Sequence, residues 1–280
     1  MMKVSQLLKD AVSQLSAHSD TARLDAEILF TFALSWRRTQ LITQDDQLLN
    51  DHQVDKILQL IRRRIQGEPI AYIVGEQEFW SLPLHVDSNT LIPRPETELL
   101  VESALDVLLT EKAQNVLDLG TGSGAVALAL ASERKLHRFI AVDISADALA
   151  VAKNNSKKLG IESVEFRCGN WFAALNNLER FDLIVSNPPY IKSDDPHLAQ
   201  GDVAFEPRTA LASGEDGLLD IRSIAENAKD YLNAASWIMF EHGWNQSADV
   251  RNILAVNGYD NIQSLKDLSG HERVTKAQKK

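Results

Sequence analysis

From residue 115 onward, short apolar segments alternate with helical patterns, and this alternation constrains the fold more than any other feature. The extended segments read NVLDLG, RFIAVDIS, VEFRCG, FDLIVSN and SWIMFEHG, and the clearest helical patterns span 124–134 and 145–159. Apolar strands that alternate with helices form a parallel sheet covered on both faces. We therefore predict an α/β fold with a doubly wound sheet, in which the fourth segment lies beside the first.

The part of the chain before this sheet has helical spacing. Apolar residues recur every three or four positions in VSQLLKDAVSQL, in DTARLDAEILFTFALSW, where Asp20 is the candidate N-cap, and in VDKILQLIRRRI. The segment EFWSLPLHVD indicates a hairpin, and Pro95 suits the first turn of a new helix. We predict a small helical N-terminal domain (1–75), a hairpin linker (76–93) and a larger C-terminal domain (94–280).

Composition and charge narrow the class of protein. No apolar run reaches the roughly 18 residues of a membrane span, and the first ten residues carry charges where a signal peptide needs an apolar stretch. The single cysteine, Cys168, fits a reducing compartment. The net charge of −10 argues against a protein whose main task is to grip nucleic acid. We expect a cytoplasmic protein, by default a monomer, with no membrane and no stable nucleic-acid partner.

The segment VLDLGTGSGAVALALA predicts a strand, a glycine-rich turn and a helix. Gly120, Gly122 and Gly124 allow the backbone to turn tightly and to approach a ligand closely. Asp143 ends the next strand, 23 positions after Gly120, a spacing typical of a carboxylate that binds a ribose diol. The same glycines also satisfy the dinucleotide pattern, and a glycine turn without a ligand is a further alternative.

Asp118 separates the two cofactor classes. A pyrophosphate is repelled by a carboxylate just before its glycine turn. S-adenosylmethionine has no phosphate and carries a sulfonium and an ammonium group, so it tolerates that carboxylate. The pattern therefore favours the methyl donor over a nicotinamide cofactor, although a shared fold alone does not decide function.

The fourth strand segment ends abruptly at Asn187-Pro188-Pro189-Tyr190. Ligands of doubly wound sheets lie beyond the carboxyl ends of the strands, so Asn187 is expected beside the glycine turn. The Asn187 side-chain oxygen and the Pro188 carbonyl can accept the two protons of a planar NH2 group, and Tyr190 can stack on it. This arrangement suits methylation of a planar nitrogen. The alternative is a simple strand-terminating turn, since both dipeptides are ordinary turn signals.

Together, DLGTGSG, AVDIS and NPPY resemble an S-adenosylmethionine-dependent methyltransferase that acts on a planar nitrogen. The segments EFWSLPLHVDSNTLIPRPETE, NPPYI, FEPRTAL and GHERVTKA are similar to the release factor glutamine methyltransferases (HemK/PrmC type) over nearly the whole chain. The resemblance implies a Rossmann-like class I methyltransferase sheet of seven mostly parallel strands. It also implies methyl transfer to the glutamine amide nitrogen in the Gly-Gly-Gln loop of class-I peptide chain release factors. We expect the N-terminal helices, which carry no chemical site of their own, to help recognise that protein.

The resemblance also implies roles for individual residues and no metal. Asn187, Pro188 and Tyr190 would be catalytic, and with Pro189 they would hold the glutamine amide. The cofactor would be bound by Gly120, Thr121, Gly122, Ser123, Gly124, Asp143, Asn170, Trp171 and Asn187.

Three observations leave alternatives to these assignments open. Trp171, taken alone, is better explained as a core aromatic than as a residue that borders an adenine. Where the family often carries a glycine pair before the fifth strand, this chain reads NAASWIMF. The corner would also serve a nucleic-acid methyltransferase that acts on an adenine or guanine amine. More distant alternatives are a non-catalytic cofactor binder and a nicotinamide oxidoreductase.

Overall fold

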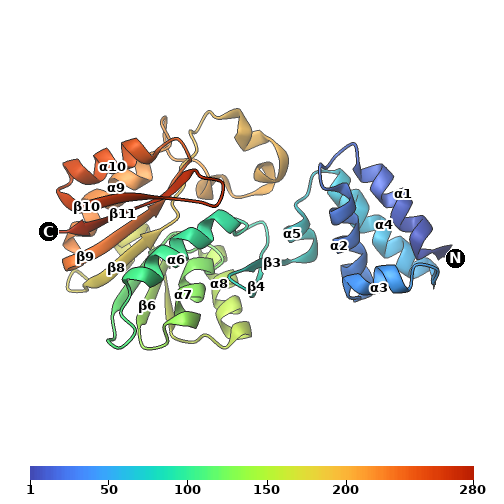
Figure 1. Cartoon of the computed structure of the whole chain (residues 1–280), viewed down its shortest axis with the longest axis horizontal. Coiled ribbons are helices and arrows are strands. Elements are labelled where there is room, and N and C mark those ends of the chain that lie inside the picture. Colours follow the sequence, from blue (N-terminus) through green and yellow to red (C-terminus); the bar gives the residue numbers. More distant parts are fainter. The chain divides into compact units, whose positions relative to one another are not determined.

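The computed structural model describes all 280 residues, and the chain divides into two compact units. The N-terminal unit comprises Met1–Glu76 together with Gln200–Phe205, and the C-terminal unit comprises Gln77–Ala199 and Glu206–Lys280. Figure 1 labels their elements. None of the helices combines the length and the apolar character needed to cross a membrane.

The N-terminal unit is helical, as predicted. Its helices close around an apolar core that includes Leu15, Leu29, Phe30 and Ile57, all fully buried. A short antiparallel pair links the start of the chain to the segment before the fourth helix. The elements are α1 (Val4–Leu15), α2 (Ala22–Leu34), α3 (Arg38–Thr43), α4 (Asp51–Ile65), α5 (Ile70–Val74), β1 (Met2–Lys3) and β2 (Leu48–Leu49).

The start of α2 differs from the sequence prediction. The helix begins at Ala22 with Thr21 at the N-cap position, so the assignment of Asp20 as N-cap is wrong. The hydroxyl of Thr21 donates to the carboxylate of Asp25 at 2.8 Å, and so does that of Ser19. The acidic side chain that organises this end of the helix is therefore the buried Asp25 inside the first turn.

A segment distant in sequence joins this unit through Arg64. Its Nε donates to Asp25 and its Nη1 to Asp202, at 2.8 and 2.9 Å. No sequence pattern predicted that residues 200–205 would cluster with the N-terminal helices, because Arg64 and Asp202 are 138 positions apart.

The predicted hairpin forms between β3 (Glu76–Phe79) and β4 (Leu82–His85). Trp80 and Ser81 occupy its two-residue loop with φ values of 52° and 59°. Positive φ at both central residues is the type I′ pattern, whose twist matches that of paired strands.

Seven strands form one mostly parallel sheet, which confirms the predicted fold class. The order is β10-β11-β9-β8-β5-β6-β7, and β8 pairs in parallel with β5 as expected. Only β10 and β11, at one edge, introduce antiparallel pairing. The strands are β5 (Asn115–Leu119), β6 (Arg138–Asp143), β7 (Val164–Cys168), β8 (Phe181–Ser186), β9 (Leu232–Glu241), β10 (Tyr259–Lys266) and β11 (Glu272–Lys279).

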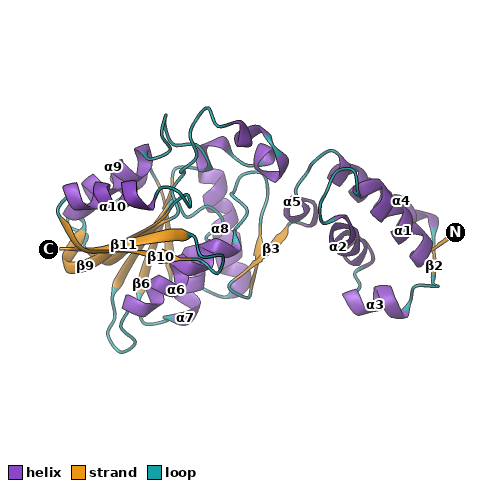
Figure 2. Ribbon diagram, turned by 45° about the horizontal axis from the view of Figure 1, so that its top comes forward, coloured by secondary structure: helices purple, strands orange, loops and turns teal.

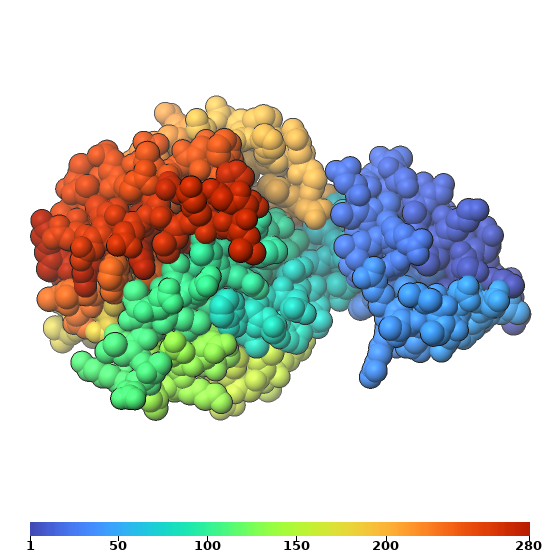
Figure 3. All heavy atoms as spheres, in the orientation of Figure 1, coloured from blue at the N-terminus to red at the C-terminus, as the bar shows by residue number.

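Helices cover both faces of this sheet (Figure 2). Helices α6 (Glu98–Val107) and α7 (Ala125–Glu133) pack on one face, whereas α9 (Leu219–Asn227) and α10 (Ser247–Val256) pack on the other. On the side drawn in Figure 3, the red end of the chain and green α6 form one continuous surface. The remaining helical elements are α8 (Ala146–Leu159), η1 (Pro95–Thr97), η2 (Trp171–Ala174), η3 (Pro196–Ala199), η4 (Gly201–Phe205), η5 (Arg208–Ala210) and η6 (Ala228–Asp230).

The alanine pair that replaces the family's glycines lies at an irregular point of β9. Ala235 is exposed and has a φ of 59°, and the pairing of β8 with β9 shifts register between Leu232 and Trp237. A left-handed conformation costs a residue with a Cβ about 1–2 kcal/mol. Alanine in place of glycine at position 235 therefore lowers stability locally, and the sheet still forms.

Replacing Ala235 by Gly should stabilise the protein by about 0.5–1 kcal/mol, because the gain in left-handed backbone freedom exceeds the added entropy of the unfolded chain. Urea denaturation measures the difference in the free energy of unfolding. Ala234→Gly is the matched control, since Ala234 is exposed and has no positive φ. The Ala234→Gly substitution should destabilise the protein. Equal effects of the two substitutions would contradict this account.

Candidate active site

The glycine turn between β5 and α7 adopts the strained conformation that its sequence predicts. Gly120, Gly122 and Gly124 all have positive φ, at 77°, 55° and 84°. The backbone N–H groups of Gly120 and Thr121 donate to the Val142 carbonyl, at 2.8 and 3.0 Å, which ties the turn to β6. A Cβ at Gly122 would meet no atom within 4 Å, so this backbone faces open space.

Asp143 bridges the turn and the start of α8. Its Oδ2 accepts from the Gly122 N–H at 2.8 Å and its Oδ1 from the Ser145 N–H at 2.9 Å. Ser145 in turn caps α8 by accepting from the Ala148 N–H at 3.1 Å. The carboxylate is half-buried and fixed in direction, and each of its oxygens can accept a further hydrogen bond.

Asn170 and Trp171 follow β7 at the same edge of the sheet. A Cβ at Gly169 would lie 2.7 Å from that of Ala174, so only glycine fits before them. Trp171 has a φ of 47°, which is unusual for a bulky residue and is typical of functional sites. Its ring lies against the backbone of Gly120, where a Cβ would be 3.3 Å away. Trp171 therefore packs on the apolar core and faces the turn at once.

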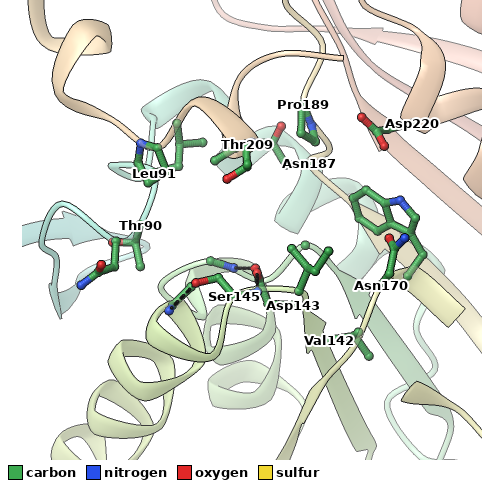
Figure 4. Close-up of a pocket in the computed structure, with 18 of the residues that line it drawn as sticks. Thr90, Leu91, Val142, Asp143, Ser145, Asn170, Asn187, Pro189, Thr209 and Asp220 are labelled. Atoms are coloured by element: carbon green, nitrogen blue, oxygen red, sulfur yellow. Dashed lines mark hydrogen bonds between the residues drawn. The ribbon is translucent and has the colours of Figure 1, made fainter. Parts of the chain in front are cut away.

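These segments enclose a cavity of about 400 Å³. Figure 4 shows Asp143 and Ser145 on one side of it, Asn187 and Pro189 on the opposite side, and Asn170 and Asp220 at one end. Of the residues predicted from the sequence, those that line it are Gly120, Gly122, Asp143, Asn170, Trp171, Asn187 and Pro189.

The other predicted residues do not line the cavity. Thr121 donates its hydroxyl to Asp118 at 2.7 Å, and the carbonyl of buried Ser123 accepts from Asn155. Gly124 precedes α7, and Pro188 is buried. Tyr190 is also absent from the lining, so its predicted contact with the planar group stays a prediction.

The Asn-Pro-Pro-Tyr corner is held at both ends by hydrogen bonds. Asn187 Nδ2 donates to the Thr97 hydroxyl at 3.2 Å, and the Tyr190 hydroxyl donates to Glu241 Oε1 at 3.3 Å. The Gln246 side chain donates to the Tyr190 carbonyl at 3.0 Å. Because the hydrogen bond to Thr97 uses the NH2 group of Asn187, the Asn187 side-chain oxygen is available to accept another hydrogen bond.

Several residues of the site were not identified from the sequence. Thr209 and Thr97 fall within FEPRTAL and LIPRPETE, which carried the family resemblance without an assigned role. Asp220 and Glu241 had no distinguishing signal, since an acidic residue at the start of a helix or the end of a strand is common. The lining residues that were missed include Ser88, Asn89, Thr90, Leu91, Thr209, Ala210 and Asp220.

Two buried carboxyl groups flank the site. Burial raises the pKa of Asp118 to about 7, an effect that the hydrogen bond from Thr121 opposes. Burial likewise raises the pKa of Glu241 to about 7, an effect that the hydrogen bond from Tyr190 opposes. Burial and the charge of Glu241 also raise the pKa of the Tyr190 hydroxyl, so this phenol stays protonated. Asp118 and Glu241 are thus partly ionised at neutral pH although both are buried.

Replacing Asp118 by Asn should stabilise the protein in alkaline solution. The folded pKa of about 7 lies above the ordinary value of 3.8, so the folded protein retains a proton that the unfolded chain releases. The contribution of Asp118 to stability is therefore greatest at low pH and is lost as pH rises toward 7. We expect the Asn variant to gain roughly 2–4 kcal/mol at pH 8.5 relative to pH 4.

Urea denaturation at several pH values measures this gain. Asp147→Asn, in the first turn of α8 and exposed, is the control and should leave the pH profile unchanged. Parallel profiles for wild type and Asp118→Asn would contradict the raised pKa.

The fold and the cavity at the carboxyl ends of its strands define a methyltransferase domain. The family model described as "Methyltransferase domain" matches residues 110–261, and that described as "PrmC N-terminal domain" matches residues 6–75. A methyltransferase from Pyrococcus furiosus has a TM-score of 0.54 at 15% identity, covering 78% of this chain and 96% of that one. A 16S rRNA methyltransferase of T. thermophilus has a TM-score of 0.52 at 20% identity, covering 73% and 50%. These two likenesses show the fold.

Curated relatives narrow the class to one family. The release factor glutamine methyltransferase of Aliivibrio fischeri is 46% identical, over 99% of this chain and 98% of its own length. That of Escherichia coli is 45% identical, over 98% of both chains. The chain belongs to the release factor glutamine methyltransferase family, as its motifs indicated.

Proposed function

We propose that this protein transfers a methyl group from S-adenosylmethionine to the side-chain amide nitrogen of the glutamine in the Gly-Gly-Gln loop of class-I release factors. One observation carries the proposal: Asn187 and Asp143 face each other across one cavity, within a chain of this family. An acceptor for an NH2 group thus lies opposite an acceptor for a ribose diol.

The residues present fit S-adenosylmethionine. The free acceptor capacity of Asp143 suits two ribose hydroxyls, and Asn170 and Trp171 would border the adenine. The open backbone at Gly122 leaves room for the amino-acid part of the cofactor. Buried Asp118 lies just before the turn, and its ionised form suits a cation and repels a phosphate. When bound, S-adenosylmethionine supplies an electrophilic methyl group on a positively charged sulfur.

The protein's own contribution is to align a poor nucleophile. The lone pair of an amide nitrogen is delocalised, so the amide must be held close to the methyl carbon and correctly oriented. Asn187 Oδ1 and the Pro188 carbonyl would accept hydrogen bonds from the two N–H groups of the amide. The adjacent prolines keep these acceptors rigid. Alignment of this kind can contribute up to about 7–11 kcal/mol. The nitrogen loses one proton as it gains carbon, and we assign no general base to it.

The nucleic-acid alternative has less support. An adenine or guanine amine is also a planar NH2 group, so the corner alone does not distinguish these substrates. Family membership and the net charge of −10 favour a protein substrate. We also propose that the N-terminal helices help to recognise the release factor.

The first test is a methylation assay with the full chain, labelled S-adenosylmethionine and, separately, a class-I release factor, DNA and ribosomal RNA. We expect label only in the release factor, and mass spectrometry should place one methyl group on the loop glutamine. Calorimetry should detect binding of S-adenosylmethionine and none of NAD. Label in nucleic acid alone, or binding of NAD alone, would overturn the proposal.

The second test removes the acceptor side chain. Asn187→Ala should lower kcat by about 10²–10³-fold or more, the loss typical for one oriented polar group of an active site. Affinity for S-adenosylmethionine, measured by calorimetry, should fall only moderately, because Asp143 and Trp171 are unchanged. Asn176→Ala, in an exposed turn after η2, is the control. Full turnover by the Asn187 variant would exclude the role given to the corner.

A further inference from the structure

The backbone of the Asn-Pro-Pro-Tyr corner takes its position from the segments at its two ends. Pro188 and Pro189 have no backbone N–H, so they cannot donate to a neighbouring strand. At the first end, the Ser186 hydroxyl donates to the Leu119 carbonyl at 2.7 Å. The second end is Tyr190, and the way in which it is held therefore helps to determine where the Pro188 carbonyl lies.

The Tyr190 carbonyl is held from two sides. The Gln246 side chain donates to it at 3.0 Å. A Cβ at Gly217 would lie 2.3 Å from the same oxygen and 2.9 Å from Gln246 Nε2, so only glycine fits there. Gly217 precedes α9, and Gln246 is the N-cap residue of α10. Two loops distant from the corner in sequence thus meet at this carbonyl.

The Gln246 carboxamide has one orientation that satisfies both of its neighbours. Its Oε1 accepts from the Gly243 N–H at 2.8 Å, while its Nε2 donates to the Tyr190 carbonyl. Rotating the amide by half a turn would place oxygen against the Tyr190 carbonyl and NH2 against the Gly243 N–H, and both contacts would be repulsive. The side chain thus joins the loop between β9 and α10 to the corner in a fixed geometry.

The residue after Tyr190 is anchored as well. The Ile191 N–H donates to the Leu211 carbonyl at 2.9 Å, and the Ile191 carbonyl accepts from the Ser213 N–H at 2.8 Å. Ala212, which lies between these two partners, lines the cavity. The end of the corner is therefore tied both to the α10 loop and to a wall of the cavity.

We propose that Gln246 and Gly217 are positioning residues for methyl transfer, because they fix the Tyr190 carbonyl and thereby the level at which the corner offers its acceptors to a substrate NH2 group. The inference rests on the proposed function and identifies groups that its alignment step needs. Neither residue lines the cavity. A misplacement of about 1 Å can cost about 100-fold in rate, so residues that never touch the substrate can control turnover.

The first test separates the two hydrogen bonds of Gln246. Gln246→Glu keeps an oxygen for the Gly243 N–H but, when ionised at about pH 8.5, repels the Tyr190 carbonyl. Gln246→Met removes both bonds. Calorimetry counts the S-adenosylmethionine-binding sites in each preparation, and methylation of a class-I release factor then gives kcat per site. We expect kcat per site to fall about 100-fold in both variants. The KM for the release factor should change by less than about threefold, because its contacts away from the corner are unaffected.

The matched control is Asn257→Asp, at the other end of α10. The Asn257 carboxamide also donates to a backbone carbonyl, that of Ile253, at 2.9 Å, so the same chemical change is made away from the corner. It should leave kcat per site unchanged. If Gln246 only stabilised the fold, Gln246→Glu would have fewer binding sites, each with the wild-type rate. That result would overturn the proposal.

Gly217→Ala tests the other side of the carbonyl. Gly217 has a φ of 79°, so alanine adds backbone strain as well as a Cβ that must displace the Tyr190 oxygen. Gly160→Ala is the control, because Gly160 has a φ of 67° and a Cβ there would meet no atom within 4 Å. We expect kcat per site to fall about 100-fold in Gly217→Ala and to stay unchanged in Gly160→Ala. Equal rates per site in the two variants would overturn the proposal.

Failure of this inference and failure of the proposed function give different results. If the wild type does not methylate the release factor, the proposed function fails and the inference fails with it. If the wild type methylates the release factor and the Gln246 and Gly217 variants do so at the same rate per site, the inference alone fails.

Discussion

The parallel pairing of β5 with β6 and β8 is the constraint on which the site depends. Leu119, the last residue of β5, lies opposite Val142 and Ser186. Because the three strands run in the same direction and in register, the residues that follow them emerge at one edge and at one level. The Ser186 hydroxyl donates to the Leu119 carbonyl at 2.7 Å and locks that level. The glycine turn, Asp143 and Asn187 are thereby delivered to one cavity.

This convergence has an energetic cost that the rest of the domain offsets. Asp118 and Glu241 are buried carboxyls with raised pKa values, and Trp171 holds a left-handed backbone. Each feature is unfavourable to the isolated fold and is retained only where surrounding structure determines it. Two large apolar clusters on opposite faces of the sheet supply that support. The destabilising groups sit around the cavity, where a cationic ligand or an oriented side chain can use them.

The predictable parts of this protein are those encoded locally. Strand and helix alternation, the glycine turn and the Asn-Pro-Pro-Tyr corner are contiguous patterns, so their elements and their meeting point followed from the sequence. Thr97 and Glu241 could not be identified from the sequence, because their contacts with the corner span 90 and 51 positions and produce no periodic pattern. The N-cap of α2 could not be predicted either. Thr21 rather than Asp20 occupies it, and Asp25 in the first turn is stabilised by a hydrogen bond from Arg64, 39 positions away.

A corner that only accepts hydrogen bonds cannot by itself tell an amide from a base amine. In the proposed function, its two acceptors select a planar NH2 group as the target. The identity of the molecule carrying the NH2 group must be read elsewhere, on surfaces around the cavity mouth. Substrate class and substrate identity are therefore separable properties of this protein. In the proposed function, the corner at Asn187 selects the first, and residues away from the reacting nitrogen select the second.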